Sequence, residues 1–525
     1  MKRTALQKVV LTFLAFVVFL FAADGSVWGE EQGDDRKKDN KNKATSPGEE
    51  QEQLSVTTHT MGIGKKELTY RATAGEILVE LEKGAGKGRF FYVAYELESG
   101  EDAKRPITFA FNGGPGAAAV WLHLGGIGPQ RVVLSEDGRP LPPPVQYADN
   151  PSTWLPFTDL VFIDPINTGF SRSIPEKSEA ARKFLGVQQD IESVAAFIRL
   201  YLTRNNRWLS PAFLVGESYG TLRAAGLSGH LQERYGISLN GIVLISPVLD
   251  FSTISQQTSD DLSYLLYLPT YTATAWYHRL LSPPMSVSSL EQVLRSAEAF
   301  SMHEYALLLL KGDVISGEEQ EKLLTALQTY TALSPELIRQ NNYRVDWADF
   351  SLNLLGAPNR LVGRMDTTVT ALNPAPDAPV PVFDPALDPL YGSFSSAMNA
   401  YVRDVLDFKT DQTYEFLNAD VNRQWDWQSG IHHEQGFVDM SRSLRNAMAV
   451  NPDLNVYIAC GIYDLATPYF AAVYTLNHMW LQERKEAVEL KTYPAGHMLF
   501  LNKSVLEDFF RDIEAFYKKA LRQKE

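Results

Sequence analysis

The stretch that decides the fold of this chain is Gly216-Glu217-Ser218-Tyr219-Gly220. An apolar run at residues 212–215 precedes it, and a helical pattern of small residues at 221–231 follows it. A strand, a sharp turn and a helix in this order carry the serine at the apex of the turn. The flanking glycines leave room for a strained turn that pushes the hydroxyl out of the sheet, so Ser218 is a candidate nucleophile.

Two partners for this serine follow downstream, each after a predicted strand. The apolar run 455–461 predicts a buried strand, and Asp464 lies on the loop after it. The run 488–493 predicts another strand, with His497 on the next loop and a helix running to the C-terminus. Taken singly, each residue has a simpler interpretation, Asp464 as a cap of the helix that starts near Thr467 and His497 as a surface histidine. Together with Ser218, their order predicts a triad in which His497 removes the serine proton and Asp464 orients the imidazole.

A glycine-rich loop upstream predicts an oxyanion site. The apolar strand 107–111 runs into Asn112-Gly113-Gly114-Pro115-Gly116, where glycines allow backbone N–H groups to approach a ligand. A phosphate-binding loop is the alternative, but neither Gly-Lys-Ser/Thr nor Gly-x-Gly-x-x-Gly spacing is present. The expected oxyanion donors are the N–H groups of Gly114 and Tyr219, worth about 3 kcal/mol each to the transition state.

The order serine, aspartate, histidine at strand ends is typical of the α/β-hydrolase fold. We therefore expect a mostly parallel central sheet flanked by helices. Residues 54–250 would form the first part of the core, including N-terminal hairpins, and residues 437–525 the second part. Between them, 251–436 is irregular and mainly helical, which predicts a large cap insertion over the active site. Its aromatic residues either line a substrate pocket or fill the core of the cap.

The chain resembles the serine carboxypeptidase family over roughly residues 55–515, and it looks closest to a bacterial branch with few cysteines. The matching pieces are Asn112 to Gly116, Gly128-Pro129, Asp164-Pro165, Gly169-Phe170-Ser171, Gly216 to Gly220, the Asp464 loop and Gly496-His497-Met498. The resemblance implies release of single C-terminal residues from peptides that have a free C-terminus. It also implies that Asn112 and Glu217 hold the substrate's C-terminal carboxylate, with Gly113 as a further substrate-binding residue.

Glu217 has a physical consequence for binding. A carboxyl group can bind another carboxylate only if one of them carries the shared proton, so acidic conditions should favour the complex. Three positions depart from the family: Ala110 replaces a tryptophan, Ala117 a cysteine and Gly126 a glutamate. These departures leave open a serine esterase or acyltransferase with the same triad. A binding protein on an inactive hydrolase fold is a further alternative.

The N-terminal residues predict export. Basic residues precede an apolar run at 9–23, which predicts a signal peptide over residues 1–25 and no stable membrane insertion after its cleavage. Residues 26–53 are charged and polar and predict a disordered linker. We therefore expect a secreted or periplasmic protein. The net charge of −14 argues against nucleic acid as a partner.

Nothing in the sequence calls for a cofactor, and the oligomeric state stays open. Cys460 is the only cysteine, so no internal disulfide forms, and its apolar strand predicts a core position. His432-His433-Glu434 lacks the His-Glu-x-x-His spacing of a zinc site. We therefore predict no metal.

Overall fold

The computed structural model describes residues 51–81, 86–98, 105–176, 179–257, 260–356, 359–428 and 436–522. The expected signal peptide, residues 26–50 of the expected linker and His432-His433-Glu434 lie outside the described residues. The last residues of that linker contact the folded body, because Glu52 forms an ion pair of 2.8 Å with Arg204. Within the described ranges, no helix combines the length and apolar character needed to cross a membrane.

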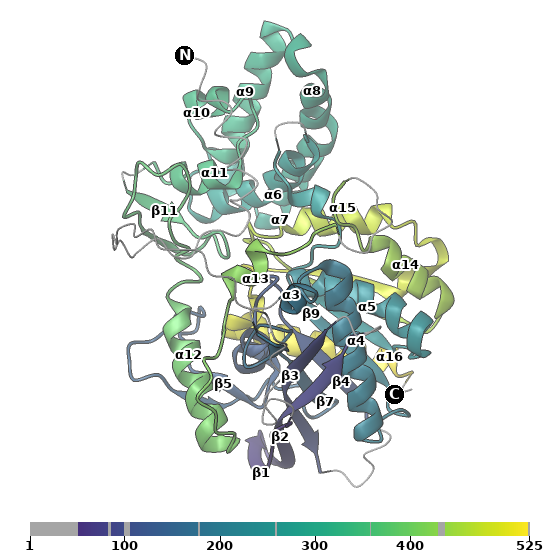
Figure 1. The fold of residues 1–525 in the computed structure, drawn as a ribbon. Coiled ribbons are helices and arrows are strands. Elements are labelled where there is room, and N and C mark those ends of the chain that lie inside the picture. The colour runs from purple at the N-terminus through teal and green to yellow at the C-terminus, as the bar shows by residue number, and fades with distance from the viewer. Residues whose placement is uncertain are drawn as a thin grey trace, which may run out of the picture.

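The centre of the molecule is a ten-stranded mixed sheet (Figure 1). Its strands lie in the order β1-β2-β3-β7-β4-β9-β10-β13-β14, with β8 paired to β3. Their bounds are β1 Leu54–Ile63, β2 Lys66–Glu80, β3 Lys87–Leu97, β4 Ile107–Phe111, β7 Asp159–Ile163, β8 Arg172–Ile174, β9 Ala212–Glu217, β10 Gly241–Ile245, β13 Asn455–Gly461 and β14 Val488–Tyr493. β1, β2 and β3 form the expected antiparallel hairpins, and all neighbours from β7 to β14 are parallel. This is the predicted α/β-hydrolase sheet.

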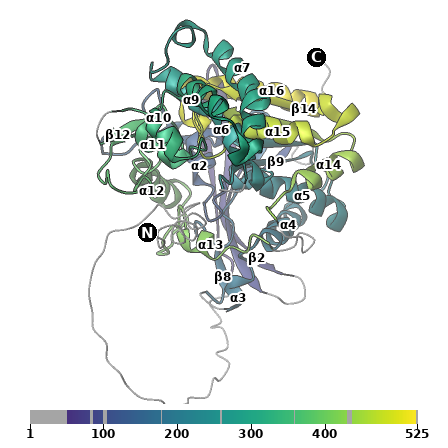
Figure 2. The same ribbon diagram turned by 90° about the horizontal axis from the view of Figure 1, so that it is seen from above.

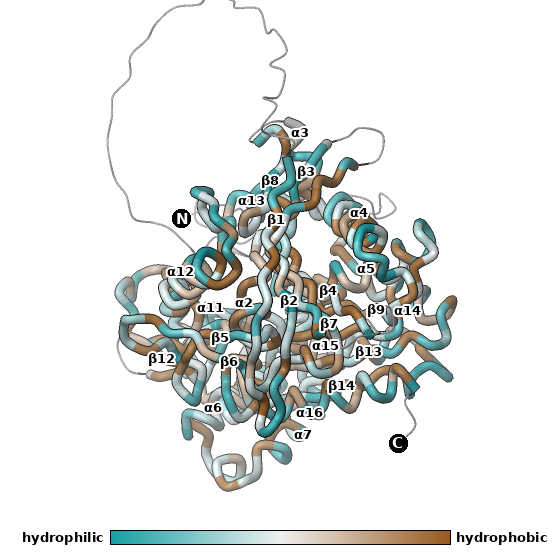
Figure 3. Tube along the Cα trace, turned by 90° about the horizontal axis from the view of Figure 1, so that it is seen from below, coloured by the Kyte–Doolittle hydropathy of each residue, from teal (hydrophilic) through white to brown (hydrophobic). Residues whose placement is uncertain are grey.

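Burial explains why the parallel strands were readable as apolar runs. Every residue of β4, β7, β9 and β10 is buried, because helices cover both faces of a parallel sheet. β1 lies at the edge and alternates exposed and half-buried side chains. In Figure 3, β1 and β2 accordingly run as a long pair in mainly pale tones of intermediate hydropathy.

Alternate side chains of the sheet enter two separate cores. Phe109 and Leu214 face the core formed with α4 (Val187–Arg204) and α5 (Tyr219–Tyr235). Their neighbours Ala110 and Val215 face the core formed with α12 (Leu390–Ala400) and α16 (Lys503–Ala520). Figure 2 shows α4 and α5 on one side of the strands and α12 on the other. The candidate site residues Ser218, Asp464 and His497 follow the carboxyl ends of three parallel strands, β9, β13 and β14.

A mainly helical insertion separates β10 from β13; a group of its helices stands above the sheet in Figure 1, whereas α12 lies beside the sheet. Its helices include α6 Leu262–Tyr277, α7 Leu290–Phe300, α8 Ala306–Lys311, α9 Gly317–Thr331, α10 Pro335–Gln340, α11 Trp347–Asn353 and α13 Ala419–Arg423. Capping boxes at Ser289 and Ser316 start α7 and α9. Tyr264, Tyr267 and Tyr271 of α6 are buried within the insertion. A two-stranded sheet of β11 (Arg360–Val362) and β12 (Thr370–Leu372) follows α11.

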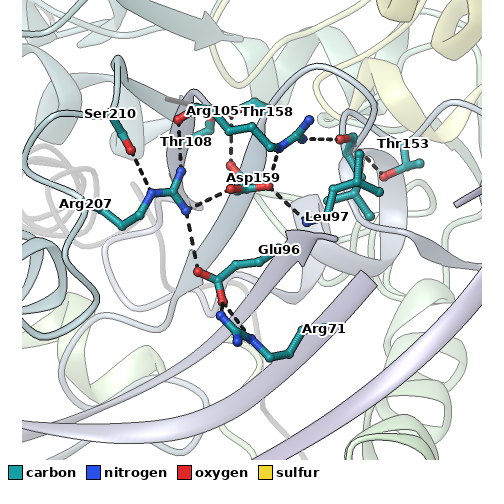
Figure 4. Close-up of polar contacts among 11 residues, drawn as sticks. Arg71, Glu96, Leu97, Arg105, Thr108, Thr153, Thr158, Asp159, Arg207 and Ser210 are labelled. Carbon is teal, nitrogen blue, oxygen red and sulfur yellow. Dashed lines mark hydrogen bonds and ion pairs between the residues drawn. The ribbon is translucent and has the colours of Figure 1, made fainter. Parts of the chain in front are cut away.

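A network of ionised side chains ties the amino end of β7 to its neighbours (Figure 4). Asp159 accepts hydrogen bonds from Arg207 Nη1 at 2.8 Å and Arg105 Nε at 2.9 Å. Arg207 also lies 3.5 Å from Glu96, which in turn pairs with Arg71 at 2.6 Å. Arg207 and Asp159 are almost completely buried, so the charge of Asp159 is compensated by Arg207 and Arg105 together.

Arg207→Met is expected to lower the free energy of unfolding by about 3 kcal/mol, because it removes one of the two arginines that compensate the buried charge of Asp159. The network lies at the amino ends of the parallel strands, away from Ser218, so kcat of the folded variant should not change. Chemical denaturation and steady-state kinetics check both parts. The control is Arg295→Met, which removes an exposed ion pair with Glu291 and should cost less than about 1 kcal/mol. A large fall in kcat at unchanged stability would contradict the prediction.

Candidate active site

Ser218 lies at the apex of the turn between β9 and α5. Its backbone has φ 58° and ψ −131°, a region that costs a non-glycine residue about 1–3 kcal/mol. Its N–H donates to the carbonyl of Ile245 on β10 at 3.0 Å. The turn has no room for side chains beside it, because a Cβ at Gly216 would lie 2.1 Å from the Gly220 carbonyl oxygen. The predicted strained turn is therefore present, held by the neighbouring strand.

Gly216→Ala is expected to destabilise the protein by about 3 kcal/mol or more, because the new Cβ would overlap backbone atoms that cannot turn away. Thermal or chemical unfolding measures this loss. Gly392→Ala is the matched control: its Cβ would meet nothing within 4 Å, and alanine in helix α12 should stabilise by about 0.5 to 1 kcal/mol. Equal stability of the two variants would mean that the turn relaxes easily.

Asp464 and His497 form a buried pair. His497 Nδ1 lies 2.7 Å from Asp464 Oδ2, and both side chains are almost fully enclosed. Asp464 also accepts hydrogen bonds from the N–H groups of Ala466 at 2.7 Å and Thr467 at 3.0 Å, and from the Thr467 hydroxyl at 2.8 Å. The helix-cap interpretation of Asp464 is wrong, because the next helix, α15 (Tyr469–His478), has Pro468 at its N-cap and no side-chain cap; Asp464 instead holds the loop before it. The other ring nitrogen of His497, Nε2, lies 3.3 Å from a carboxylate oxygen of Glu217.

A segment of the insertion fastens the loops that carry this pair. The carbonyl of Arg364 accepts from Leu465 N–H at 2.9 Å, and the carbonyl of Met365 accepts from His497 N–H at 2.6 Å. Thr367 N–H donates to the Tyr463 carbonyl at 3.0 Å. The sequence analysis missed this role of residues 364–367, because backbone hydrogen bonds leave no motif.

Ser218 and His497 line one cavity of about 180 Å³. Among the described residues, the Ser218 hydroxyl makes no hydrogen bond to His497. Instead, His497 Nε2 lies 3.3 Å from Glu217 Oε1. The second carboxylate oxygen of Glu217 accepts a hydrogen bond from Asn112 Nδ2 at 3.0 Å. Catalytic hydrogen bonds are often long or absent in a free enzyme, so this arrangement is compatible with a triad that aligns on substrate binding.

The electrostatics of this cluster follow from burial and charge. Burial alone would lower the pKa of His497, but the carboxylates of Asp464 and Glu217 outweigh it and raise the pKa to about 9. Burial raises the pKa of Glu217, while His497 and the Asn112 amide work against that rise. His497 thus has a carboxyl group at each ring nitrogen, and these two groups together favour its protonated form.

The glycine loop after β4 packs against the start of α5. A Cβ at Gly113 would lie 2.5 Å from the Tyr219 nitrogen, and Gly114 has φ +102°, which favours glycine. Gly114 and Tyr219 both line the cavity beside Ser218. The sequence analysis missed the support of this loop: Arg223 Nη1 donates to the Asn112 carbonyl at 2.7 Å while its Nε is bound by the buried Asp190 at 2.7 Å.

Two of the three positions that depart from the family pattern, Gly126 and Ala110, lie in closely packed surroundings. A Cβ at Gly126 would lie 2.9 Å from the Cβ and Cγ atoms of Phe500, so that ring takes the space of a longer side chain. Ala110 is fully buried in the sheet, against the α12 and α16 side. Glu217 therefore has Asn112 as its side-chain hydrogen-bond partner, without a glutamate at position 126.

The wall of the cavity combines aromatic rings and charges from distant parts of the chain. Arg364 stacks over the ring of Trp347 at 4.6 Å from its centroid. Other residues of the wall are Trp121, Phe251, Phe383, Asp384, Asp388, Tyr391, Trp427 and Met498. None of the α6 aromatics lines the cavity that the described residues form. The buried ones, Tyr264, Tyr267 and Tyr271, belong to the core instead.

Within the described ranges, no group of three or more histidine, cysteine, aspartate or glutamate side chains could hold a metal ion. Cys460 is buried in β13, as predicted, and burial raises the pKa of its thiol well above the usual range. The cysteine is therefore a core residue rather than a second nucleophile.

Comparison with known proteins adds a family. A family model described as serine carboxypeptidase matches residues 71–502. Among solved structures, a proline iminopeptidase from Mycobacterium smegmatis is 12% identical, with 89% of this chain and 100% of that chain covered and a TM-score of 0.31. A thermophilic esterase from Thermogutta terrifontis is 11% identical, with 85% and 98% covered and a TM-score of 0.33. A carboxyl esterase from Bacillus coagulans is 12% identical, with 84% and 98% covered and a TM-score of 0.34. At such scores these likenesses carry no argument about activity.

Proposed function

Because the chain belongs to the serine carboxypeptidase family of hydrolases, we propose that it is an exported enzyme that releases C-terminal amino acids from peptides. The observation that carries this proposal is the position of Glu217. Its buried carboxyl group is hydrogen-bonded by Asn112 at 3.0 Å and lines the same cavity as Ser218 and His497. A substrate whose terminal carboxylate meets Glu217 would bring its last peptide bond to the serine.

The chemistry would proceed through an acyl-enzyme. Ser218 Oγ attacks the carbonyl carbon of the last peptide bond while His497 takes its proton, and the N–H groups of Gly114 and Tyr219 stabilise the oxyanion. His497 then gives the proton to the departing amino acid. Water, activated by His497, releases the peptide and restores the serine. Asp464 holds the imidazole in one orientation throughout, through its bond to Nδ1.

The substrate's C-terminal carboxylate would be bound by Asn112, Gly113 and Glu217. The Asn112 side chain is oriented by Leu122 N–H, which donates to its Oδ1 at 3.1 Å, so Nδ2 is directed at Glu217. Because Glu217 is itself a carboxyl, it needs a proton to bind an anion. No cofactor enters this mechanism.

Export of the enzyme rests on the N-terminal sequence. Lys2, Arg3 and Lys8 precede the apolar run at 9–23, and the polar stretch 26–53 would link the cleavage region to the hydrolase core. The site of action would be the periplasm or the medium. A bacterial origin within the family is in keeping with the single cysteine. The net charge of −14 makes nucleic acid an unsuitable partner.

The test compares a blocked dipeptide that has a free C-terminal carboxylate with its C-terminal amide, from about pH 4 to 8, with Ser218→Ala as the control. We expect kcat/KM for the free acid to exceed that for the amide by at least about 100-fold, because the amide leaves the carboxylate-binding groups unpaired. Equal hydrolysis of both compounds, or hydrolysis of esters alone, would contradict the carboxypeptidase.

The second candidate is a serine esterase or acyltransferase that uses the same triad. It is favoured by Phe500, which occupies the space beside Gly126 and leaves Glu217 with fewer partners than the family pattern provides. Preference for an uncharged ester over the free-acid dipeptide would support it. A hydrolase-fold binding protein without activity would show no turnover of any of these substrates.

A further inference from the structure

His497 lies between two carboxylates, which is one more than a triad requires. Asp464 Oδ2 is 2.7 Å from Nδ1 and Glu217 Oε1 is 3.3 Å from Nε2. Nε2 is the nitrogen that must accept the Ser218 proton. In the free protein this nitrogen faces Glu217, and the described residues include no hydrogen bond from Ser218 to it. In this arrangement Glu217, the residue that would bind the substrate's carboxylate, occupies the nitrogen of His497 that has to accept the Ser218 proton.

The charges around His497 come from three elements. Asp464 and Glu217 favour its protonated form, and Arg364 of the insertion disfavours it. Asp366 approaches the backbone of Gly496, next to the histidine. A histidine with carboxylates at both nitrogens retains its proton at neutral pH. An imidazolium has no lone pair for the serine proton, so this protonated form of the free enzyme is the inactive one.

We propose that the substrate's C-terminal carboxylate drives a proton from His497 Nε2 to Glu217 Oε1, so that recognition of the free C-terminus switches on the catalytic base. This inference rests on the proposed function. The N–H bond at Nε2 breaks and its electron pair stays on the nitrogen, while an O–H bond forms at Oε1. The imidazolium and the carboxylate both become neutral, and no proton enters from solvent.

The geometry supports this direction of transfer. Asn112 donates to Glu217 Oε2, so Oε1 is the oxygen that faces both Nε2 and the cavity. Two carboxylates in contact cannot both stay ionised, so an arriving carboxylate makes the proton on Glu217 favourable. Glu217 O–H can then donate to the substrate, and Nε2 becomes free to accept from Ser218. Coupled groups of this kind titrate as a pair.

The consequence is that selectivity for a free C-terminus appears in kcat and not in KM alone. A substrate without a terminal carboxylate leaves the proton on His497. Such a substrate is turned over only at alkaline pH, where His497 has lost its proton to solvent. A peptide with a free carboxylate is turned over at neutral pH, because its binding deprotonates the base.

The location of the proton is measured by ¹⁵N NMR of histidine-labelled, full-length Ser218→Ala protein at pH 7, with His497→Gln used for assignment. Without ligand, both nitrogens of His497 should show the shifts of an imidazolium. Saturating N-acetylphenylalanine should move Nε2 alone to the shift of an unprotonated nitrogen, and N-acetylphenylalaninamide should not. A bound free acid with Nε2 still protonated would overturn the transfer and leave carboxylate recognition intact. Failure of the free acid to bind would overturn the proposed function instead.

A kinetic test uses p-nitrophenyl acetate, which carries no carboxylate. For the wild type, kcat should rise only toward about pH 9, following His497. Glu217→Gln removes the second carboxylate, so the midpoint should move at least about one unit to lower pH. The control Glu298→Gln, at a carboxyl bound by Tyr469 outside the site, should leave the midpoint in place. A purely structural role of Glu217 predicts the same midpoint in all three proteins, which would overturn the proposal.

Discussion

Replacing Ser218 with alanine is expected to lower kcat for peptide hydrolysis by about 10⁶-fold, since no acyl-enzyme can then form. The residual rate would come from binding and from the oxyanion donors alone. Steady-state hydrolysis of the blocked free-acid dipeptide measures the loss. Alanine removes only the hydroxyl, which makes no hydrogen bond to His497 in the free protein, so thermal unfolding should change little.

The matched control for this substitution is Ser228→Ala in the same helix, α5. The Ser228 hydroxyl is buried and donates to the Ala225 carbonyl at 2.6 Å, away from the cavity. Its loss should leave kcat within about twofold of the wild type, because the side chain touches no group of the site. If Ser218→Ala kept more than about 1% of the activity, Ser218 would not be the nucleophile.

Asp464→Asn is expected to lower kcat by about 10⁴-fold at neutral pH. The amide has nearly the same shape as the carboxylate, but its NH₂ group can donate toward Nδ1 and select the wrong tautomer of His497. The variant also loses one of the two negative charges that raise the pKa of His497, so the rise of kcat with pH that follows this histidine should move to lower pH. A pH series of kcat with the free-acid dipeptide measures both effects.

Asp512→Asn tests whether loss of any carboxylate has such an effect. Asp512 accepts from Lys491 Nζ at 2.5 Å and from the Tyr493 hydroxyl at 2.6 Å, and it does not line the cavity that holds Ser218 and His497. Its replacement should leave kcat within about twofold. A nearly normal kcat in Asp464→Asn would mean that another group orients His497.

The fold could be read from the sequence because its parallel strands are buried on both faces. β13 and β14 begin and end at the predicted residues, 455–461 and 488–493, and the predicted strand 107–111 is β4. Their side chains need no polar face, so each strand appears as a short apolar run. The strand, turn and helix around Ser218 were readable for the same reason, with glycines marking the places where a Cβ cannot fit.

The parts that the sequence did not reveal depend on contacts between distant segments. Arg223 supports the Asn112 loop across more than a hundred residues, and the carbonyl of Met365 fixes His497 from within the insertion. No sequence pattern indicates that a charged residue in a helix or a carbonyl in a loop makes such a contact. The packing of Phe500 on Gly126 likewise joins segments far apart in the chain. The positions of Ser218 and its two partners were predictable, while their catalytic roles stay predictions.

The most direct measurement of the central claim is covalent labelling with a fluorophosphonate, mapped by tandem mass spectrometry. The label should appear on Ser218 of the wild type and be absent from Ser218→Ala. N-acetylphenylalanine should protect the serine from labelling, and its amide should not, because only the free acid meets Asn112 and Glu217. Labelling of another residue, or no labelling of the folded protein, would contradict the proposed nucleophile. Equal protection by both compounds would contradict recognition of the C-terminal carboxylate.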